Sequence, residues 1–370
     1  MIRFIQSHLK PERLCSGICR FPRVFIFLSL LLTSFPAASF SVKPEMKTKK
    51  RSHIHIVGSS TVYPFSAVIA ETFGRDTEFR TPIVEATGTG GGFKFFCSGV
   101  GFSYPDFVNA SRRIEVSEVR RCLENNIKEI VEIKIGYDGI TLAKSNSGPK
   151  FQLTKTQIFL ALAEKIPDKN TGQLIENPYT KWRDIDLKLP DVKIRIYGPP
   201  STSGTRDAFS ELVMEEACIN MEEFVEIYPD KKIRGKKCRI IRSDGAFIEA
   251  GENDNLIIQK LRNDNSAFGI FGFNFLEENR NLIQPSLING FSPTLDNIAS
   301  AAYPISRPLF IYFKKEHLNL VPGMKEFIHE IISENTIGKD GYLLQKGLIP
   351  LSDFELKQVQ NEVLKAIKTE

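Results

Sequence analysis

The feature that most constrains the fold is a unit made of a short β-branched run, a hydroxyl-rich loop and a helix. Its first copy covers residues 53–70, HIHIVGSSTVYPFSAVIA, where the run 54–57 predicts a buried strand that ends at Gly58. Apolar residues at helical spacing over 65–73 predict a helix with one apolar face. A helix N-terminus presents unpaired N–H groups and a positive dipole end, so the loop could hold an anion, although such hydroxyls often only cap the helix.

The same unit recurs along the chain, which favours the anion-site interpretation. A strand over 83–86 leads into TGTGGG at 87–92, whose glycines can turn backbone N–H groups toward an anion. This loop is not a P-loop, because its lysine is not followed by Ser or Thr. Another strand ends in the polar stop 109–112, and the run 194–197 leads into STSGTR at 201–206 before an apolar helix face.

Alternating strands and helices predict an α/β fold with ligands at the carboxyl ends of the strands. Residues 129–144 hold two strand-like runs around the segment 136–139, and they are expected to cross between lobes. Residues 303–312 are expected to form the return crossing. The expected organisation is residues 40–144 as the first part of lobe 1, 145–303 as lobe 2, and 304–370 as the return crossing with the rest of lobe 1. Such a chain would hold a ligand in a cleft between the lobes and close by a hinge.

Residues 1–39 have the order of a secretory signal peptide: a basic segment, the apolar run 24–32, and small residues. The alternative is a retained membrane anchor, but the apolar run falls short of the roughly 20 residues that span a bilayer. Cys15 and Cys19 precede the apolar run, so neither can be a lipid-modified cysteine at the cleavage point. We therefore expect a periplasmic protein that is not a lipoprotein.

Charge gives little support for a nucleic-acid partner. The whole chain is +5, and the leader carries five basic residues against one acidic residue, so the mature part is near +1. The basic balance therefore belongs mostly to the export signal.

Four cysteines follow the leader: Cys97, Cys122, Cys218 and Cys238. An even count in an exported chain suggests disulfides, and pairing of sequence neighbours is the simplest arrangement. Free buried thiols are the alternative. No pair has the CxxC spacing of a zinc or redox site.

The sequence offers no metal cluster and no activated nucleophile, so we expect neither a cofactor nor an enzyme. His53 and His55 share a strand face and could ligate a metal, but a solvated strand start explains them more simply.

Segments in chain order over almost the whole mature part resemble the PstS phosphate-binding proteins, which feed ABC phosphate importers. They are GSSTVYPFS, ATGTGGGFKFFCSG, PDFVNASRRI, IGYDGI, YGPPSTSGTRDAF, EAGENDNLI and YPISRP. The resemblance implies a two-lobed type II periplasmic-binding-protein fold, a dehydrated phosphate held by many hydrogen bonds, and permease subunits as partners.

Carried over by position, the resemblance and the loops together give an expected phosphate-binding set. It is Ser60, Thr61, Val62, Thr89, Gly90, Ser111, Arg112, Ser203, Gly204, Thr205, Arg206 and Asp244.

The chain departs from the better-known branch at two charged positions. An aspartate usually follows the Ala-Ser of the third loop, where Arg112 stands, and an arginine usually stands at the position of Pro199. We expect Arg206 and Asp244 to supply these charges, with Asp138 as the reserve carboxylate. The simpler interpretation of Asp244 is an Asx turn or a partner for Arg242.

The sequence therefore predicts a monomeric extracytoplasmic protein that captures inorganic phosphate and delivers it to an ABC importer. The alternatives are a binding protein for sulfate, molybdate or tungstate, and a secreted phosphatase.

Overall fold

The computed structural model describes residues 50–168, 170–201, 203–251 and 254–368. The expected signal peptide at 1–39 lies outside these residues. Among the described residues, no helix combines the length and apolar character needed to cross a bilayer.

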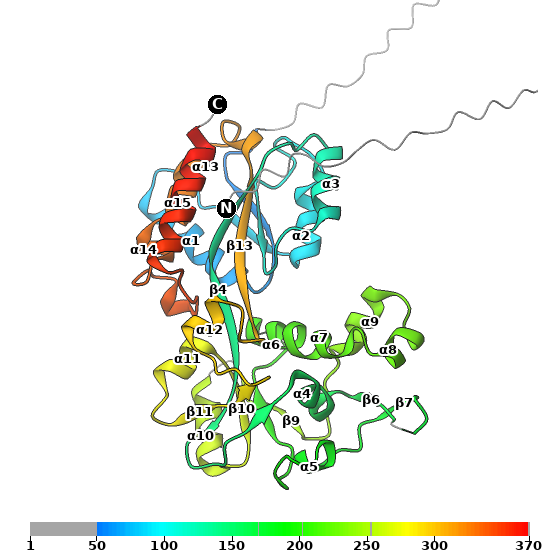
Figure 1. Cartoon of the computed structure of the whole chain (residues 1–370). Coiled ribbons are helices and arrows are strands. Elements are labelled where there is room, and N and C mark those ends of the chain that lie inside the picture. Colours follow the sequence, from blue (N-terminus) through cyan, green and yellow to red (C-terminus); the bar gives the residue numbers. More distant parts are fainter. Residues whose placement is uncertain (1–49, 169, 202, 252–253, 369–370) are drawn as a thin grey trace, which may run out of the picture. The chain divides into compact units, whose positions relative to one another are not determined.

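The first half of the fold begins with three parallel strands, each followed by a helix (Figure 1). These elements are β1 (His55–Gly58), α1 (Tyr63–Asp76), β2 (Ile83–Ala86), α2 (Thr89–Phe96), β3 (Phe107–Ala110) and α3 (Val116–Glu124). The C-terminal helices α13 (Met324–Ile331), α14 (Glu334–Ile337) and α15 (Asp353–Lys368) complete it. Phe327 of α13 lies edge-on to Phe73 and Phe107, with ring centroids 5.2 and 5.3 Å away, so the chain's end shares the core formed by its beginning.

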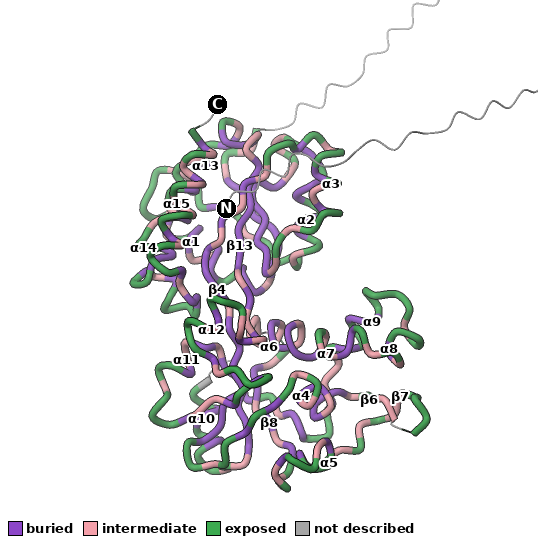
Figure 2. Tube along the Cα trace, in the orientation of Figure 1, coloured by how far each residue is buried: buried purple, intermediate pink, exposed green. Residues whose placement is uncertain are grey.

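Two long strands connect the first half to the second. They are β4 (Ile130–Ser145) and β13 (Ser306–Lys314), which pair antiparallel with a register shift between Leu309 and Phe310. The expected pair of strand runs at 129–144 is therefore one strand, buried along most of its length (Figure 2). Gly136 is required within it, because a Cβ there would lie 2.6 Å from the Ile349 carbonyl oxygen.

The second half packs helices around strands that continue the same sheet. Its first elements are β5 (Gln152–Leu153), α4 (Lys155–Leu162), β6 (Lys165–Pro167), β7 (Leu174–Glu176), α5 (Trp182–Ile185), β8 (Ile196–Gly198) and α6 (Gly204–Phe209). There follow the π-helix η1 (Ser210–Glu215), α7 (Glu216–Cys218), α8 (Glu222–Ile227), α9 (Lys231–Cys238), β9 (Phe247–Glu249) and α10 (Asp254–Asn263). The last are β10 (Phe268–Gly272), α11 (Phe273–Glu278), β11 (Ile283–Pro285), β12 (Leu287–Ile288) and α12 (Leu295–Ala299).

The main sheet formed by the described residues has nine strands in the order β2-β1-β3-β13-β4-β10-β8-β9, with β11 also paired to β4. β4 and β13 lie at the middle of this order, and β4 pairs with β10 as well as with β13. The parallel strands of each half approach this shared pair from opposite sides. Loops that follow β1, β3 and β8 can therefore meet near β4 and β13.

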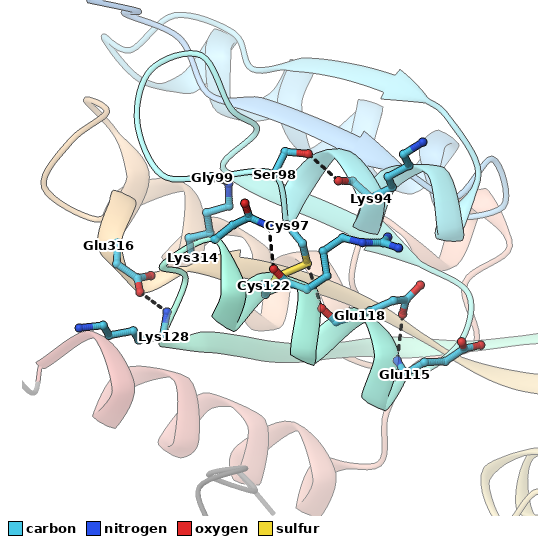
Figure 3. The surroundings of a disulfide bond; sticks show 12 residues. Lys94, Cys97, Ser98, Gly99, Glu115, Glu118, Cys122, Lys128, Lys314 and Glu316 are labelled. Carbon is cyan, nitrogen blue, oxygen red and sulfur yellow. Dashed lines mark hydrogen bonds between the residues drawn. A yellow bond between two sulfur atoms is a disulfide. The ribbon is translucent and has the colours of Figure 1, made fainter. Parts of the chain in front are cut away.

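Both expected disulfides are confirmed. Cys97–Cys122 joins the end of α2 to α3, and Cys218–Cys238 joins α7 to α9. Figure 3 shows the first bridge beside Lys314, whose Nζ donates to the Gly99 carbonyl oxygen at 2.7 Å. Each bridge closes a segment of 25 or 20 residues and so ties one helix to its neighbour in the same half.

Candidate functional site

Parallel pairing brings three loops of the first half to one edge of the sheet. The first loop (59–62) follows β1, the second (87–88) follows β2, and the third (111–115) follows β3. The Ser59 N–H donates to the Asn109 carbonyl oxygen at 2.9 Å, and the Thr87 N–H donates to the Gly58 carbonyl oxygen at 2.8 Å. Gly58 has a φ of +134°, and a Cβ on it would lie 2.2 Å from the Asn109 carbonyl oxygen. Only glycine fits here, so the first loop leaves its strand directly against the third.

The second and third loops meet through their hydroxyl groups. Thr89 is the first residue of α2, and its Oγ1 lies 3.1 Å from the Oγ of Ser111. The Ser111 N–H also donates to the Thr89 hydroxyl at 3.2 Å. These two expected site residues are thus brought together at the start of a helix, and Gly90 follows them on the exposed first turn.

The first loop leads into α1, which is longer than α2 and α3. Val62 is the N-cap of α1, Tyr63 is its first residue, and both Thr61 and Val62 are buried. No side chain caps α1 at its N-cap position, but the Tyr63 N–H donates to the Ser59 carbonyl oxygen at 3.0 Å, and Pro64, which follows, has no N–H to donate.

The fourth loop, which leads from β8 to α6 in the second half, reaches the first loop. Ser203 is the N-cap of α6 and Gly204 is its first residue. A Cβ on Gly204 would lie 3.9 Å from the Thr61 Cα, and the Ser60 hydroxyl donates to the Asp207 carboxylate at 3.1 Å. The starts of α1 and α6 therefore lie side by side, with Thr205 in the first turn of α6.

The two arginines expected to bind the anion are held by protein groups. Arg112 donates to both carboxylate oxygens of Glu118 at 2.8 and 2.9 Å, and this bond raises the pKa of Arg112. The Arg206 guanidinium lies 4.0 Å from the Phe247 ring centroid and donates to the Pro199 carbonyl oxygen at 3.2 Å. Burial lowers the pKa of Arg206.

Arg307 is the cation that our sequence reasoning missed. Its Nη2 donates to the Thr61 hydroxyl at 2.9 Å, and its Nη1 donates to Glu211 at 2.5 Å. Its side chain is only 9% exposed. The signal was an arginine in the mostly apolar run 303–312, in the segment YPISRP, which entered the resemblance and the expected crossing but not the expected site.

Asp138 faces Arg307 across the shared strands, since the two residues are direct partners in the β4–β13 register. Burial raises the pKa of Asp138. Its Oδ2 lies 3.5 Å from the Arg307 Nε, and neither buried atom has a hydrogen-bond partner among the described residues. Asp138 and Arg307 thus form a buried ion pair beside Thr61, and each keeps an atom that makes no hydrogen bond to a described residue.

Asp244, the carboxylate favoured from the sequence, lies away from the starts of α1 and α6. Its carboxylate accepts from Arg242 and from the Ala246 N–H, and its side chain is 53% exposed. Burial by itself would raise the pKa of Asp244, but these hydrogen bonds outweigh burial and lower the pKa. The residues before Asp244 form only an isolated bridge, and the strand β9 begins after it. Asp244 therefore stands at the amino end of a strand parallel to β8, at the edge opposite the start of α6.

Among the described residues, no cluster of three or more His, Cys, Asp or Glu side chains could hold a metal ion. His55, one of the two histidines considered as ligands, lies with its Nε2 3.1 Å from Glu85.

The chain matches known proteins over most of its length. Residues 43–335 match the model of the PBP superfamily domain. The phosphate-binding protein PstS of Staphylococcus haemolyticus is 30% identical over 278 residues, which are 73% of each chain. Protein SphX of Synechococcus elongatus is 29% identical over 294 residues, covering 78% of this chain and 76% of that one.

A solved structure has a similar backbone. A possible phosphate binding protein from Planctomyces limnophilus superposes with a TM-score of 0.70 at 26% identity, covering 86% of this chain and all of that one. These matches show that the chain belongs to the PBP superfamily, among the PstS phosphate-binding proteins.

Proposed function

We propose that the chain captures inorganic phosphate outside the cytoplasm and delivers it to an ABC phosphate importer. It is a binding protein and not an enzyme, as its membership of the PstS family indicates. The observation that carries the proposal is the meeting of the α1 and α6 starts beside Arg307. Backbone N–H groups of two helix N-termini and a buried guanidinium can then act on one small anion.

Most of the donors in this site are neutral. We assign phosphate contacts to the expected loop residues Ser60, Thr61, Val62, Thr89, Gly90, Ser111, Ser203, Gly204 and Thr205. The arginines around them already face carboxylates: Arg112 pairs with Glu118, Arg206 lies 3.7 Å from Glu249, and Arg307 pairs with Glu211. Phosphate recognition then depends on directed hydrogen bonds more than on net positive charge, and hydrogen bonds to a charged group are the stronger kind.

We assign the discrimination of phosphate from sulfate to Asp138 in place of Asp244. Phosphate near neutral pH keeps at least one proton, as the second pKa near 6 of a phosphate ester indicates, whereas sulfate has only acceptor oxygens. The Oδ2 of Asp138, which has no hydrogen-bond partner among the described residues, can accept that proton's hydrogen bond while Arg307 donates to another oxygen. Sulfate would leave the carboxylate facing an oxygen lone pair, which is how a site rejects a near-isostere.

Cellular context follows from the same proposal. We propose that residues 1–39 are removed on export, that the mature protein is a monomer without a lipid anchor, and that permease subunits receive the phosphate. Disulfides are typical of oxidising compartments outside the cytoplasm, which supports export. We also propose lobe boundaries at 40–144, 145–303 and 304–370, close to where β4 ends and β13 begins.

Calorimetry of the mature protein tests the proposal. We expect heat from phosphate that saturates at one anion per chain, and no comparable binding of sulfate or molybdate. Binding of another oxyanion in preference to phosphate would overturn the assignment. Release of phosphate from a phosphate ester by the purified protein would contradict the statement that the chain is not an enzyme.

A further inference from the structure

Arg307 is bound from both halves of the fold at once. Its Nη2 donates to the Thr61 hydroxyl in the first half, and its Nη1 donates to the Glu211 carboxylate in the second half. Any motion that separates Thr61 from Glu211 must therefore break one of these two bonds. The Ser60–Asp207 hydrogen bond also links the halves, but its donor is a neutral hydroxyl.

Glu211 is itself held in place by its neighbours. It lies in η1, the π-helical turn that continues α6, and its second carboxylate oxygen accepts from Arg239 at 3.2 Å. Arg239 also donates to Glu215 and directly follows Cys238, which is bridged to Cys218. π-helical turns are rare, and those that occur often lie at functional sites. Here the turn places Glu211 between Arg307 and Arg239, the residue next to the Cys218–Cys238 bridge.

We propose that Glu211 is a positioning residue that sets how long phosphate stays bound, by tying Arg307 to the second half in the closed protein. The inference rests on the proposed function, because it concerns release from the same site. Glu211 does not need to touch the anion. Its bond to Arg307 opposes the separation of the α1 and α6 starts, and an anion held between those starts leaves when they separate.

The expected effect falls on release and not on capture. Charge-assisted hydrogen bonds are about twice as strong as neutral ones, but Glu211 is 33% exposed, so solvent weakens this pair. We expect Glu211→Gln to speed phosphate release roughly tenfold while the association rate changes by less than about twofold, as interface changes usually act on dissociation.

Glu215→Gln is the matched control. Glu215 lies in the same helical turn and also accepts from Arg239, but its described contacts do not include Arg307. Release and association of phosphate would be followed by stopped-flow fluorescence for both variants and the parent protein. Thermal unfolding without phosphate separates a folding defect from the expected effect. Glu211→Asp keeps the charge with a shorter reach and should release phosphate at an intermediate rate.

Small-angle scattering of the phosphate-free proteins gives a second readout. Glu211→Gln should be more expanded than the parent protein, and Glu215→Gln should not. Equal release rates in the parent and Glu211→Gln, or equal acceleration in both variants, would overturn the role of Glu211. If the parent protein binds no phosphate, the proposed function fails. If Glu211→Gln scatters like the parent protein, the Arg307–Glu211 bond does not hold the two halves together, and this inference is refuted independently of the proposed function.

Discussion

Replacing Asp138 by Asn is the sharpest test of how the site selects its anion. The change keeps the size of the side chain but removes its negative charge. It replaces one carboxylate oxygen by an amide NH2 group, which can stand in the position of Oδ2, 3.5 Å from the Arg307 Nε. We expect phosphate to lose one charge-assisted hydrogen bond, about 1.5–3 kcal/mol, which is roughly ten- to a hundredfold in the dissociation constant.

Sulfate should respond in the opposite direction. In the parent protein the negatively charged Asp138 carboxylate would face a negatively charged sulfate oxygen. Two like charges placed opposite each other cost several kcal/mol. The cost is smaller here because the Arg307 guanidinium lies beside the carboxylate. The Asn variant removes this repulsion and can donate to sulfate. We therefore expect the ratio of phosphate to sulfate affinity to fall by roughly a hundredfold or more.

Competition calorimetry of the two anions at pH 7 would measure this ratio. Asp244→Asn is the control, because Asp244 is bound to Arg242 at the opposite edge of the second-half strands. An unchanged ratio in Asp138→Asn, or a larger change in Asp244→Asn, would refute the assignment of the discriminating carboxylate to Asp138.

Three further predictions follow from the same geometry. Arg307→Ala should weaken phosphate binding in calorimetry at least about tenfold more than Arg112→Ala, since Arg307 is buried and donates to Thr61, whereas Arg112 is 38% exposed and spends its donors on Glu118; equal losses would argue against this. Lys144 is buried; its Nζ lies 4.6 Å from the Phe151 ring centroid and has no hydrogen-bond partner among the described residues. Burial lowers the pKa of Lys144 to about 8, so the charged side chain destabilises the protein most below that pH, and this penalty lessens as pH rises toward the usual Lys value. Lys144→Met should thus stabilise the protein by roughly 1–3 kcal/mol in urea unfolding at pH 7, with the gain shrinking above pH 8; a constant gain would contradict it. Loss of the Cys97–Cys122 bridge in a double Ala variant should cost about 3 kcal/mol in the same assay, and no loss would count against the chain-entropy reasoning.

Local sequence patterns were sufficient for the parts of the site that each lie in one stretch of chain. A β-branched run followed by hydroxyl and glycine residues specifies a strand, a turn and a helix start, so the positions of Thr61, Thr89 and Ser203 could be predicted. Thr89 and Ser111 could also be expected to meet, because parallel strands bring their carboxyl ends to one edge. The nearest-neighbour pairing of the cysteines was likewise local and is confirmed.

The charged part of the site could not be predicted in this way. Asp138 and Arg307 face each other because β4 and β13 pair in a particular antiparallel register, and they are far apart in the sequence. Register between distant strands depends on how both faces of the sheet pack, which no short segment encodes. Asp244 differs for a more local reason: the β-branched pair 240–241 before it indicates a strand, but these residues form only an isolated bridge, and the strand β9 follows Asp244. A one-element error of this kind moves a side chain to the other edge of the sheet.

A crystal structure of the mature protein with phosphate at pH 7 would show directly which groups bind the anion. We expect one phosphate at the starts of α1 and α6, with its oxygens bonded to Thr61, to the N–H groups of Gly204 and Thr205, and to Arg307. One further oxygen should lie within hydrogen-bond distance of the Asp138 carboxylate. Phosphate bound elsewhere on the chain, or bound at this site without contact to Asp138 and Arg307, would refute the assignment of the anion site to these residues.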